Sequence, residues 1–326
     1  MAQTTINPAL IPKIWVAKIQ TEGAKENWVA KLTATDGSNV IHKNTELVSK
    51  KGTTITFGLE MDLTGAGVTG NNTLKGNEEA HIVFDFEVPI DQVRHAVSST
   101  EWDTQKPVYE QWPLIKKALV RWYGNWQEKM FVTKMTAAPT GTSSAGEWMS
   151  AASAGTEVAI TANDKLTCAL ISRAKRRAQM HSPKVIPVKV DGVDTYLFLA
   201  GTWAARDLKS DPVWLAAQQQ AGVRDAMKNP IFSGALGMWD GVAVYEWERI
   251  KNTLTGASSA NVVHNLLLGQ QACCHAIGRN MWPIKDSDDY ENILGQGVAF
   301  WAGIEKSVYN SKDYGVIQVL TGGAVE

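Results

Sequence analysis

The sequence predicts an α+β fold, because its helical and strand-like segments alternate without the regular strand–helix–strand period of a doubly wound parallel sheet. Two patterns carry this prediction. Strict alternation of apolar and polar residues predicts strands at 53–63 and 79–88, and apolar residues at three- and four-residue steps predict a long helix from Thr104 to about Met130. The 326 residues are enough for one large domain or two moderate ones.

The first 48 residues are polar, with apolar anchors at Trp15, Ile19, Trp28 and Leu32. This spacing is roughly helical but is interrupted by Gly23, so we expect an N-terminal arm that carries a helix or two. Such an arm has too little apolar surface to fold alone and must lie on other residues.

Residues 49–89 are predicted to form one long β-hairpin with one apolar face. Its apolar positions are Ile55, Phe57, Leu59, Met61 and Leu63, then Ile82, Phe84, Phe86 and Val88. About ten residues per strand at ~3.4 Å each give a projection on the order of 30 Å. An isolated two-stranded hairpin is marginal in water, so this face needs cover from the chain's own body or from another subunit.

The long helix has its apolar residues at Ile115, Leu119, Trp122 and Trp126, and two prolines near its start allow one helix or two joined ones. Residues 136–156 are rich in small residues and predict a surface excursion. Asp211-Pro212 is a good helix start, because Asp caps and Pro fits the first helical position. The later elements are predicted as a helix at 163–180, strands at 185–190 and 195–199, a helix from 211 to about 220, a strand at 241–247, a helix at 262–277, and strands near 297–304 and 315–320.

The charge balance is nearly neutral, with 32 basic and 33 acidic residues and a formal charge of −1. This argues against a domain that grips nucleic acid along a whole face, and it lowers the electrostatic cost of self-association. Three cysteines, Cys168, Cys273 and Cys274, cannot form a disulfide framework and fit a reducing compartment. Neither a secretory signal nor an apolar run of about 18 residues is seen, so no membrane partner is expected.

One fragment matches a nucleotide-binding pattern, since Gly65-Ala-Gly67-Val-Thr-Gly70 fits G-x-G-x-x-G. That chemistry requires the last glycine to open a helix whose N-terminus holds a pyrophosphate. The residues that follow, 71–77, form a poor helix, so glycine turns at a loop tip are the favoured interpretation. A nucleotide-binding enzyme that uses Gly65–Gly70 stays as an alternative.

No other motif predicts a catalytic residue, a cofactor or a metal. Cys273-Cys274-His275 lies in a predicted helix and lacks the spacing of zinc ligands. The acidic residues Asp286, Asp288, Asp289 and Glu291 lack the central glycine of a calcium loop and predict a solvated turn. We therefore expect that the chain is not an enzyme.

Arg173, Lys175, Arg176 and Arg177 form the strongest local charge. They suit phosphates or acidic partners, and a solvated helix face with ion pairs inside the chain explains them equally well. Thirteen tryptophans exceed what one core normally needs, and aromatic residues are enriched at protein–protein interfaces. Some of the tryptophans are therefore expected between subunits.

Six blocks of the sequence resemble the major capsid proteins of tailed bacteriophages. They are residues 54–80 (TITFGLEMDLTGAGVTGNNTLKGNEEA), 88–99 (VPIDQVRHAVSS), 169–218 (ALISRAKRRAQM and onward), 229–250 (NPIFSGALGMWDGVAVYEWERI), 264–280 (HNLLLGQQACCHAIGRN) and 312–319 (KDYGVIQV). The blocks follow one another in the expected order and cover most of the chain. The resemblance implies the capsid fold that tailed phages share with the floor of the herpesvirus capsid.

The resemblance further implies five regions: an N-terminal arm at 1–48, an extended loop at 49–89, a peripheral domain with a long spine helix at 90–200, an axial domain at 201–289, and a return to the peripheral domain at 290–326. It implies a virion protein, made in the bacterial host cytoplasm, whose hexamers and pentamers close an icosahedral shell around double-stranded DNA. Further implied partners are the packaged DNA on the inner face, a portal and a cement or decoration protein. A nanocompartment shell of the same fold is an alternative.

We expect two groups of residues to contact neighbouring copies in such a shell. One lies on the hairpin and the other on the basic helix, and no cofactor is implied for either. The candidate inter-subunit contacts are Phe57, Leu59, Met61, Lys75, Glu78, Glu79, Phe84, Phe86, Arg173, Arg176 and Arg177. Some relatives crosslink loop lysines to asparagines, but no motif near Lys75 carries that chemistry over.

Overall fold

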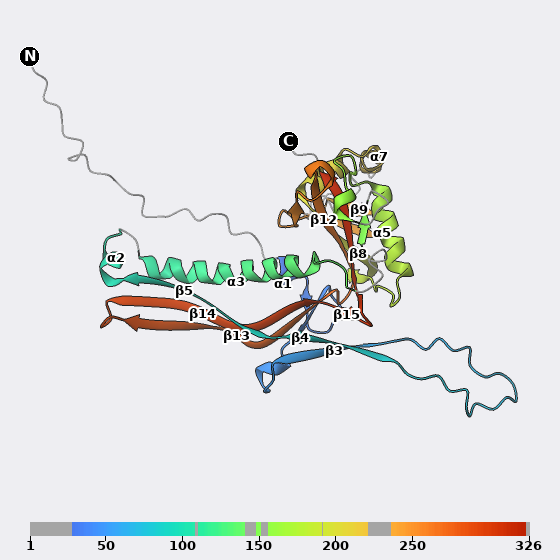
Figure 1. Cartoon of the computed structure of the whole chain (residues 1–326), viewed down its shortest axis with the longest axis horizontal. Coiled ribbons are helices and arrows are strands. Elements are labelled where there is room, and N and C mark those ends of the chain that lie inside the picture. The colour runs from blue at the N-terminus through green and yellow to red at the C-terminus, as the bar shows by residue number, and fades with distance from the viewer. Residues whose placement is uncertain are drawn as a thin grey trace, which may run out of the picture. The chain divides into compact units, whose positions relative to one another are not determined.

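Two sheets and one long hairpin organise the chain (Figure 1). The computed structural model describes residues 28–107, 110–140, 148–150, 156–190, 192–220 and 236–323. The predicted anchors Trp15 and Ile19, parts of the 136–156 excursion and the helix end near Gly222 lie outside these residues. The chain divides into two units: the first contains Gln92–Asn125 and Met281–Phe300, and the second contains Trp28–Asp91, Trp126–Asn280 and Trp301–Glu326.

The helices are α1 (Trp28–Lys31), α2 (Glu101–Gln105), α3 (Gln111–Met135), α5 (Cys168–Met180), α6 (Thr202–Lys209) and α7 (Pro212–Gln220). Short 3₁₀ turns span Glu46–Val48, Glu157–Ala159 and Ala257–Ser259. The strands are β1 (Thr33–Ala34), β2 (Ile41–Asn44), β3 (Thr54–Glu60), β4 (Val83–Pro89), β5 (Asp91–Thr100), β6 (Trp148–Ser150), β7 (Val188–Val190), β8 (Val193–Ala200), β9 (Gly237–Trp239), β10 (Val242–Glu246), β11 (Asn252–Thr253), β12 (Asn261–Leu268), β13 (Cys273–Asp288), β14 (Ile293–Lys306), β15 (Val308–Tyr309), β16 (Lys312–Asp313) and β17 (Val316–Gly323).

The eight-stranded sheet of the second unit holds most of the core. Its main path runs β6-β17-β12-β8-β10-β9, with β7 paired to β8 and β11 to β12. Strands β12 and β17 pair antiparallel over eight residues each, and every residue of both is buried. Such complete burial requires cover on both faces of the sheet. Helices α5 and α6 pack against β17.

The starts of two helices in this unit depend on one carboxylate. Helix α5 begins at Cys168 rather than at the predicted residue 163. The hydroxyl of Thr167, directly before this start, accepts a hydrogen bond from Leu170 N at 3.4 Å. Asp211 Oδ1 accepts from Val213 N at 3.1 Å and caps α7 as predicted. The other oxygen of Asp211 accepts from Cys168 N at 2.9 Å, so this side chain links the first turns of both helices.

The predicted helix at 262–277 is wrong, because these residues form β12 and the start of β13. A run of apolar residues suits a strand buried on both faces as well as a buried helix, and periodicity alone does not separate them. Gly269–Gln271 turn the chain between the two strands, and Gln271 has a positive φ of 52°. Cys273 and His275 therefore lie on a strand, where they pair in parallel with Ile41 and Lys43 of β2.

The five-stranded sheet has the order β1-β2-β13-β14-β5. Strands β1 and β2 belong to the predicted N-terminal arm, and Ile41 is 1% exposed, so this part of the arm lies within a sheet. The predicted boundary between residues 200 and 201 separates β8 from α6, although β8 pairs with β10 and β12 in a single sheet. Strands from both sides of this boundary therefore share the eight-stranded sheet.

The predicted long helix is confirmed as α3, preceded by the short α2. In the first unit α3 packs on β5 and β14 through its aromatic face (Figure 1). Trp122 stacks on His95 with ring centroids 4.6 Å apart, and Tyr123 meets Phe300 edge to face at 4.7 Å. The predicted acidic turn joins β13 to β14, and Asp289, Tyr290 and Glu291 are exposed with positive φ.

The predicted hairpin is confirmed, but its paired part is shorter than expected. Strands β3 and β4 pair antiparallel from Thr54 opposite Pro89 to Glu60 opposite Val83, seven residues each, or roughly 24 Å at ~3.4 Å per residue. One further backbone hydrogen bond joins Met61 N to Ile82 O at 3.1 Å. Glycine and asparagine, which are depleted in strands, recur between Gly65 and Asn77 and disfavour continued pairing there.

Candidate functional site

The root of the hairpin is covered by its own chain. Ile55, Phe57 and Val88 are buried in a small cluster with Cys274 and Ala276 of β13, and Leu47, Phe86 and Ile90 pack around it. The Phe57 ring meets the His42 ring edge to face, with centroids 5.1 Å apart. Its own chain leaves only 4% of Phe57 exposed, which disfavours the predicted contact of this residue with another subunit.

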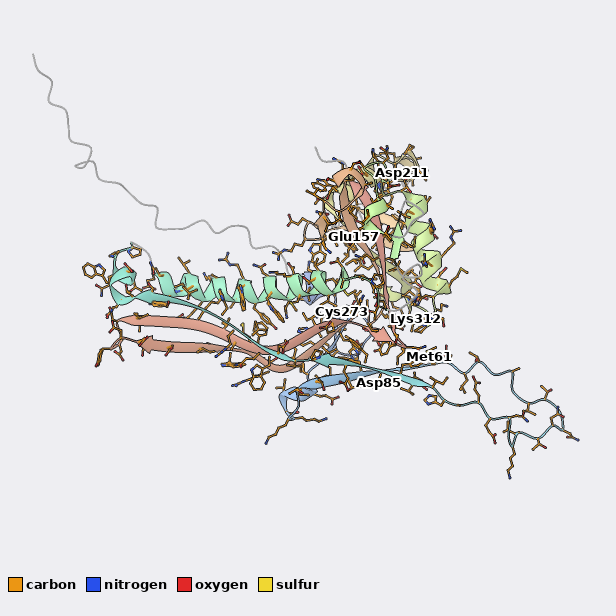
Figure 2. All side chains as sticks on the ribbon, in the orientation of Figure 1. Met61, Asp85, Glu157, Asp211, Cys273 and Lys312 are labelled. Carbon is orange, nitrogen blue, oxygen red and sulfur yellow. The ribbon has the colours of Figure 1, made fainter. Side chains whose placement is uncertain are left out.

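The middle of the apolar face is half-buried. Leu59, Met61, Phe84 and Phe86 are in this class, and the Phe86 ring lies 6.2 Å from the Tyr309 ring in an edge contact. Figure 2 shows Met61 where the paired strands give way to an open loop. These four side chains retain apolar surface that their own chain leaves uncovered.

The distal residues of the hairpin have little cover. Leu63, Leu74, Ile82 and Val83 are 65%, 62%, 51% and 55% exposed. Apolar cover is thus greatest at the root and small at most apolar positions beyond it, although Val68 in the tip is half-buried. Alternation in the sequence identified Leu63 and Ile82, whereas Leu74 lies in the irregular tip and has no periodic signal.

The glycine motif lies in this tip and opens no helix, so the nucleotide-binding alternative lacks its structural requirement. The Glu79 carboxylate instead accepts hydrogen bonds from the backbone N–H groups of Thr64 and Gly65, both at 2.7 Å, and from the Thr64 hydroxyl at 3.1 Å. The two backbone donors are the main reason why the pKa of Glu79 is lowered. The amide of the first glycine is therefore already occupied by an internal anion.

The two other predicted tip residues are exposed. Glu78 Oε2 accepts a hydrogen bond from Gly76 N at 2.7 Å, which closes a local turn. Lys75 stands in that turn between Leu74 and Gly76. The structure thus brings Glu78 and Glu79 together at the tip, each holding a different part of the loop.

The predicted basic cluster lies on α5 in the second unit. Its helix buries Leu170, Ala174 and Ala178, and leaves Arg173 and Arg176 exposed and Arg177 half-buried. Lys175 Nζ pairs with Asp240 Oδ1 at 2.9 Å, so one member of the cluster has an ion pair within the chain. An ion pair within the chain therefore explains Lys175, and the contact of the three arginines with a partner stays a prediction.

The structure also contains two buried histidines that sequence reasoning missed. His264 of β12 is fully buried, with Nδ1 2.6 Å from Gln318 Nε2 and Nε2 3.5 Å from Glu157 Oε1. Burial lowers its pKa to about 4. Burial lowers the pKa of His275 to about 4 as well, and its Nε2 atom lacks a hydrogen-bond partner. No spacing pattern marks either residue, because their burial depends on which strands pair.

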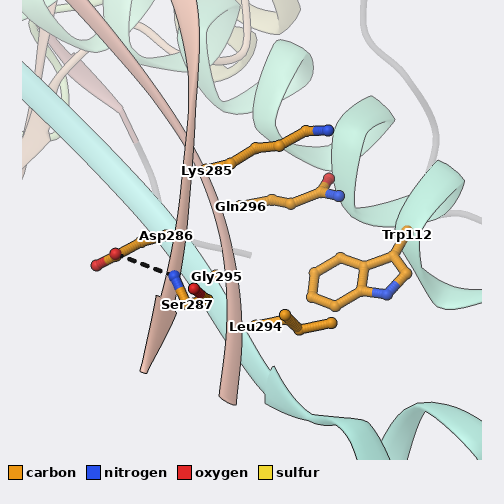
Figure 3. A pocket seen from close by; sticks show the side chains of 7 residues that line it. All are labelled: Trp112, Lys285, Asp286, Ser287, Leu294, Gly295 and Gln296. Atoms are coloured by element: carbon orange, nitrogen blue, oxygen red, sulfur yellow. Dashed lines mark hydrogen bonds between the residues drawn. The ribbon is translucent and has the colours of Figure 1, made fainter. Parts of the chain in front are cut away.

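A groove of about 430 Å³ lies in the first unit. Figure 3 shows Trp112, Lys285, Leu294 and Gln296 pointing into it, while Asp286 points away and accepts a hydrogen bond from Ser287 N at 3.0 Å. None of the predicted contact residues lines this groove.

The three thiols are buried, and burial raises the pKa of Cys168 to about 12 and of Cys274 to about 11. Thiols with such pKa values are poor nucleophiles. Among the residues that the structure describes, no three His, Cys, Asp or Glu side chains gather as metal ligands would. None of the described helices is long and apolar enough to cross a membrane.

A family model described as phage capsid protein matches residues 3–157 and 143–325. The chain belongs to the phage capsid protein family. This capsid protein is 27% identical over 355 aligned residues to the major capsid protein of Pseudomonas phage KPP25, with 94% of this chain and 93% of the relative covered. The predicted resemblance to tailed-phage major capsid proteins is thereby confirmed.

Solved structures share the fold of the capsid protein. The capsid asymmetric unit of cyanophage Pam1 superposes with a TM-score of 0.86 at 23% identity, with all of both chains covered. The capsid of Ralstonia phage GP4 gives 0.82 at 24% identity, with 99% of both chains covered, and that of Helicobacter pylori bacteriophage KHP30 gives 0.77 at 15%, with 97% of both covered. The predicted α+β capsid fold is confirmed, and the capsid protein is a structural component of the virion shell.

Proposed function

We propose that the capsid protein assembles with copies of itself into hexamers and pentamers that close an icosahedral phage head around double-stranded DNA. The falling apolar cover along the hairpin carries this proposal. The root is packed within its own chain, whereas Leu63, Leu74 and Ile82 each expose more than half of their surface. Exposed apolar side chains grouped on one projecting element are typical of an interaction site.

The occupant of this face is a second copy of the chain. Leu59, Met61 and Phe84 would complete their burial there, and Phe86 would contribute what Tyr309 leaves uncovered. Lys75, Glu78 and Glu79 would form the polar rim, as charged residues do at other interfaces. Phe57 belongs to the root and has no place in the proposed contact.

Arg173, Arg176 and Arg177 are proposed to meet acidic side chains of an adjacent copy. Arg173 and Arg176 are exposed on α5, and rim charges of this kind steer association and lose strength in salt. The double variant Arg173→Glu, Arg176→Glu tests this contact. An assembly rate equal to that of the parent chain at both low and high salt would refute it.

The other proposed partners follow from the role of a head protein. They are the packaged DNA on the inner face, a portal and a decoration protein. No catalytic step is proposed for any residue. We also propose that β3 and β4 form the extended loop, that α3 is the spine helix and that the domain facing the capsomer centre begins before β8 rather than at residue 201.

Deleting residues 64–78 tests the central claim. Electron microscopy of the expressed protein is expected to show closed shells for the parent chain and none for the deletion. The charge variant Lys189→Glu, at an exposed position of β7, serves as a control that keeps the hairpin intact. Closed shells of normal size from the deletion would refute the docking role of the hairpin.

A further inference from the structure

The base of the distal loop is closed by one side chain. Glu79 uses both carboxylate oxygens: Oε1 accepts from Thr64 N and Thr64 Oγ1, and Oε2 accepts from Gly65 N. Thr64 lies 15 positions before Glu79 in the sequence, so these bonds join the two sides of the hairpin. Charge-assisted hydrogen bonds from backbone amides to a carboxylate are among the stronger ones in proteins.

The other links in the hairpin show why this one matters. On the root side, Met61 N bonds to Ile82 O, and His81 Nε2 lies 2.8 Å from Glu60 Oε1. On the tip side, the hydrogen bonds found among residues 66–78 join partners no more than four positions apart. Within the described residues, Glu79 therefore makes the cross-hairpin link that lies farthest from the paired strands.

The glycine at position 65 fits this arrangement. A Cβ at Gly65 would stand 2.7 Å from Glu79 Oε2, which is too close for both to keep their places. Gly67 and Gly70 differ, because nothing lies within 4 Å of a Cβ added at either and their φ angles are positive, at 69° and 68°. The first glycine of the motif thus makes room for the carboxylate, and the other two allow the backbone to turn.

We infer that Glu79 is a positioning residue for assembly: it holds the distal loop in its docking conformation before a second copy arrives. This inference rests on the proposed function. Without the bond between Glu79 and residues 64–65, the segment from Leu63 to Ala80 would have no closure of its own and would have to become ordered during docking. Ordering a flexible segment on binding lowers affinity, whereas a preformed surface avoids that cost.

The variant Glu79→Gln tests this role. Glutamine keeps one acceptor but places an NH₂ group against one of the two backbone donors, so one bond is lost and a repulsive contact appears. We expect amide hydrogen exchange at Thr64 and Gly65 of the unassembled protein to speed up at least tenfold. We also expect the assembly rate, followed by light scattering, to fall several-fold, with an unchanged midpoint of urea unfolding.

Two further variants make the test specific. The control is Glu87→Gln on the polar face of β4, which lies outside the proposed contact and is expected to change neither the exchange at Thr64 and Gly65 nor the assembly rate. Gly65→Ala changes the other partner of the same contact, because its methyl group displaces the Glu79 carboxylate. It is expected to reproduce the effect of Glu79→Gln. Because both changes break one contact, the double variant should be no slower than either single one.

The outcomes separate this inference from the proposed function. If Glu79→Gln speeds exchange but leaves the assembly rate unchanged, the positioning role is refuted, even where the 64–78 deletion blocks assembly. If exchange does not change, Glu79 does not hold the loop and the inference is refuted as well. If the chain without residues 64–78 assembles normally, the docking role of the hairpin is refuted, and the inference on Glu79 is refuted with it.

Discussion

Strands β12 and β4 belong to one chain and are of nearly equal length, yet they are covered in different ways. All eight residues of β12 are buried; β17 pairs with all eight, β8 with three and β11 with two. Strand β4 has a single partner, β3, and of its seven residues only Val88 is buried. A strand inside a covered sheet is buried by its own chain along its whole length, whereas a projecting hairpin is buried by its own chain only at its root.

We therefore expect substitutions in the two regions to affect different properties, namely the stability of the single chain and the assembly of many copies. Changes in the covered sheet are expected to lower the free energy of unfolding of the single chain, because its contacts are already made there. Changes at the hairpin tip are expected to leave that free energy almost unchanged and to act on association. The predictions below test this separation, beginning with the largest effect on the single chain.

The largest effect is expected from Phe198→Ala in β8. Phe198 is fully buried and lies opposite Val244 of β10 and Leu267 of β12. Removing a ring from such a site leaves a cavity, so the free energy of unfolding should fall by about 3–5 kcal/mol. Urea unfolding of the unassembled protein measures this. Val193→Ala on the same strand, 59% exposed, is the matched control and should change it by less than about 0.5 kcal/mol.

Acid is expected to destabilise the covered sheets through their histidines. The pKa values of His264 and His275 lie near 4 in the folded chain, mainly because burial lowers them from the ordinary 6.5. As the pH falls from about 6.5 to 4, the unfolded chain binds protons that the folded chain excludes, so stability is present at neutral pH and lost through this window. Each residue should contribute a loss of about 3 kcal/mol by pH 4.

The variant His275→Leu checks the sign of this effect. Leucine cannot bind a proton and leaves no unpaired ring nitrogen, so urea unfolding at pH 7, 5.5 and 4 should show a smaller loss than in the parent chain. Val193→Leu, at an exposed position of β8, adds and removes no titratable group, so it is the control and should leave the pH dependence unchanged. An equal loss in His275→Leu and the parent would show that His275 does not titrate in this window.

Local patterns in the sequence predicted much of this fold. Alternation identified β3 and β4, a helical apolar stripe identified α3, and the Asp211-Pro212 pair identified the start of α7. Each of these signals depends on residues close together in the chain. In the candidate site, alternation places Leu59, Met61 and Phe84 on the apolar face, but it gives no signal in the irregular tip.

Long-range contacts determined what the sequence could not predict. The segment 262–277 became two strands because β2, β8 and β17 pair with it, and a run of apolar residues suits either state. Phe57 is covered by Cys274 and Ala276, more than two hundred positions away, so alternation could place it on the apolar face but not identify its cover. The partner of Glu79 lies 15 positions away in an irregular loop, where no periodicity exists.

An intermediate effect is expected from Phe57→Ala at the root of the hairpin. Phe57 is 4% exposed, but its cluster contains only a few buried residues. The site can partly collapse, so the expected loss of stability is about 2 kcal/mol, below the usual range for a deep core ring. Hydrogen exchange should speed up along β3 and β4 and stay unchanged along β12 and β17. Equal acceleration in both regions would show that the root and the covered sheet unfold together.

The smallest effect on the single chain is expected from Leu74→Ser at the tip. Its side chain is 62% exposed, so the free energy of unfolding should change by less than about 0.5 kcal/mol. If the tip docks on another copy, the same change should raise the protein concentration needed for shell assembly, because a buried leucine contributes about 1.5–3 kcal/mol. Light scattering across a concentration series measures this, with Thr73→Ser beside it as the control. A variant that is both stable and normal in assembly would exclude Leu74 from the docking face.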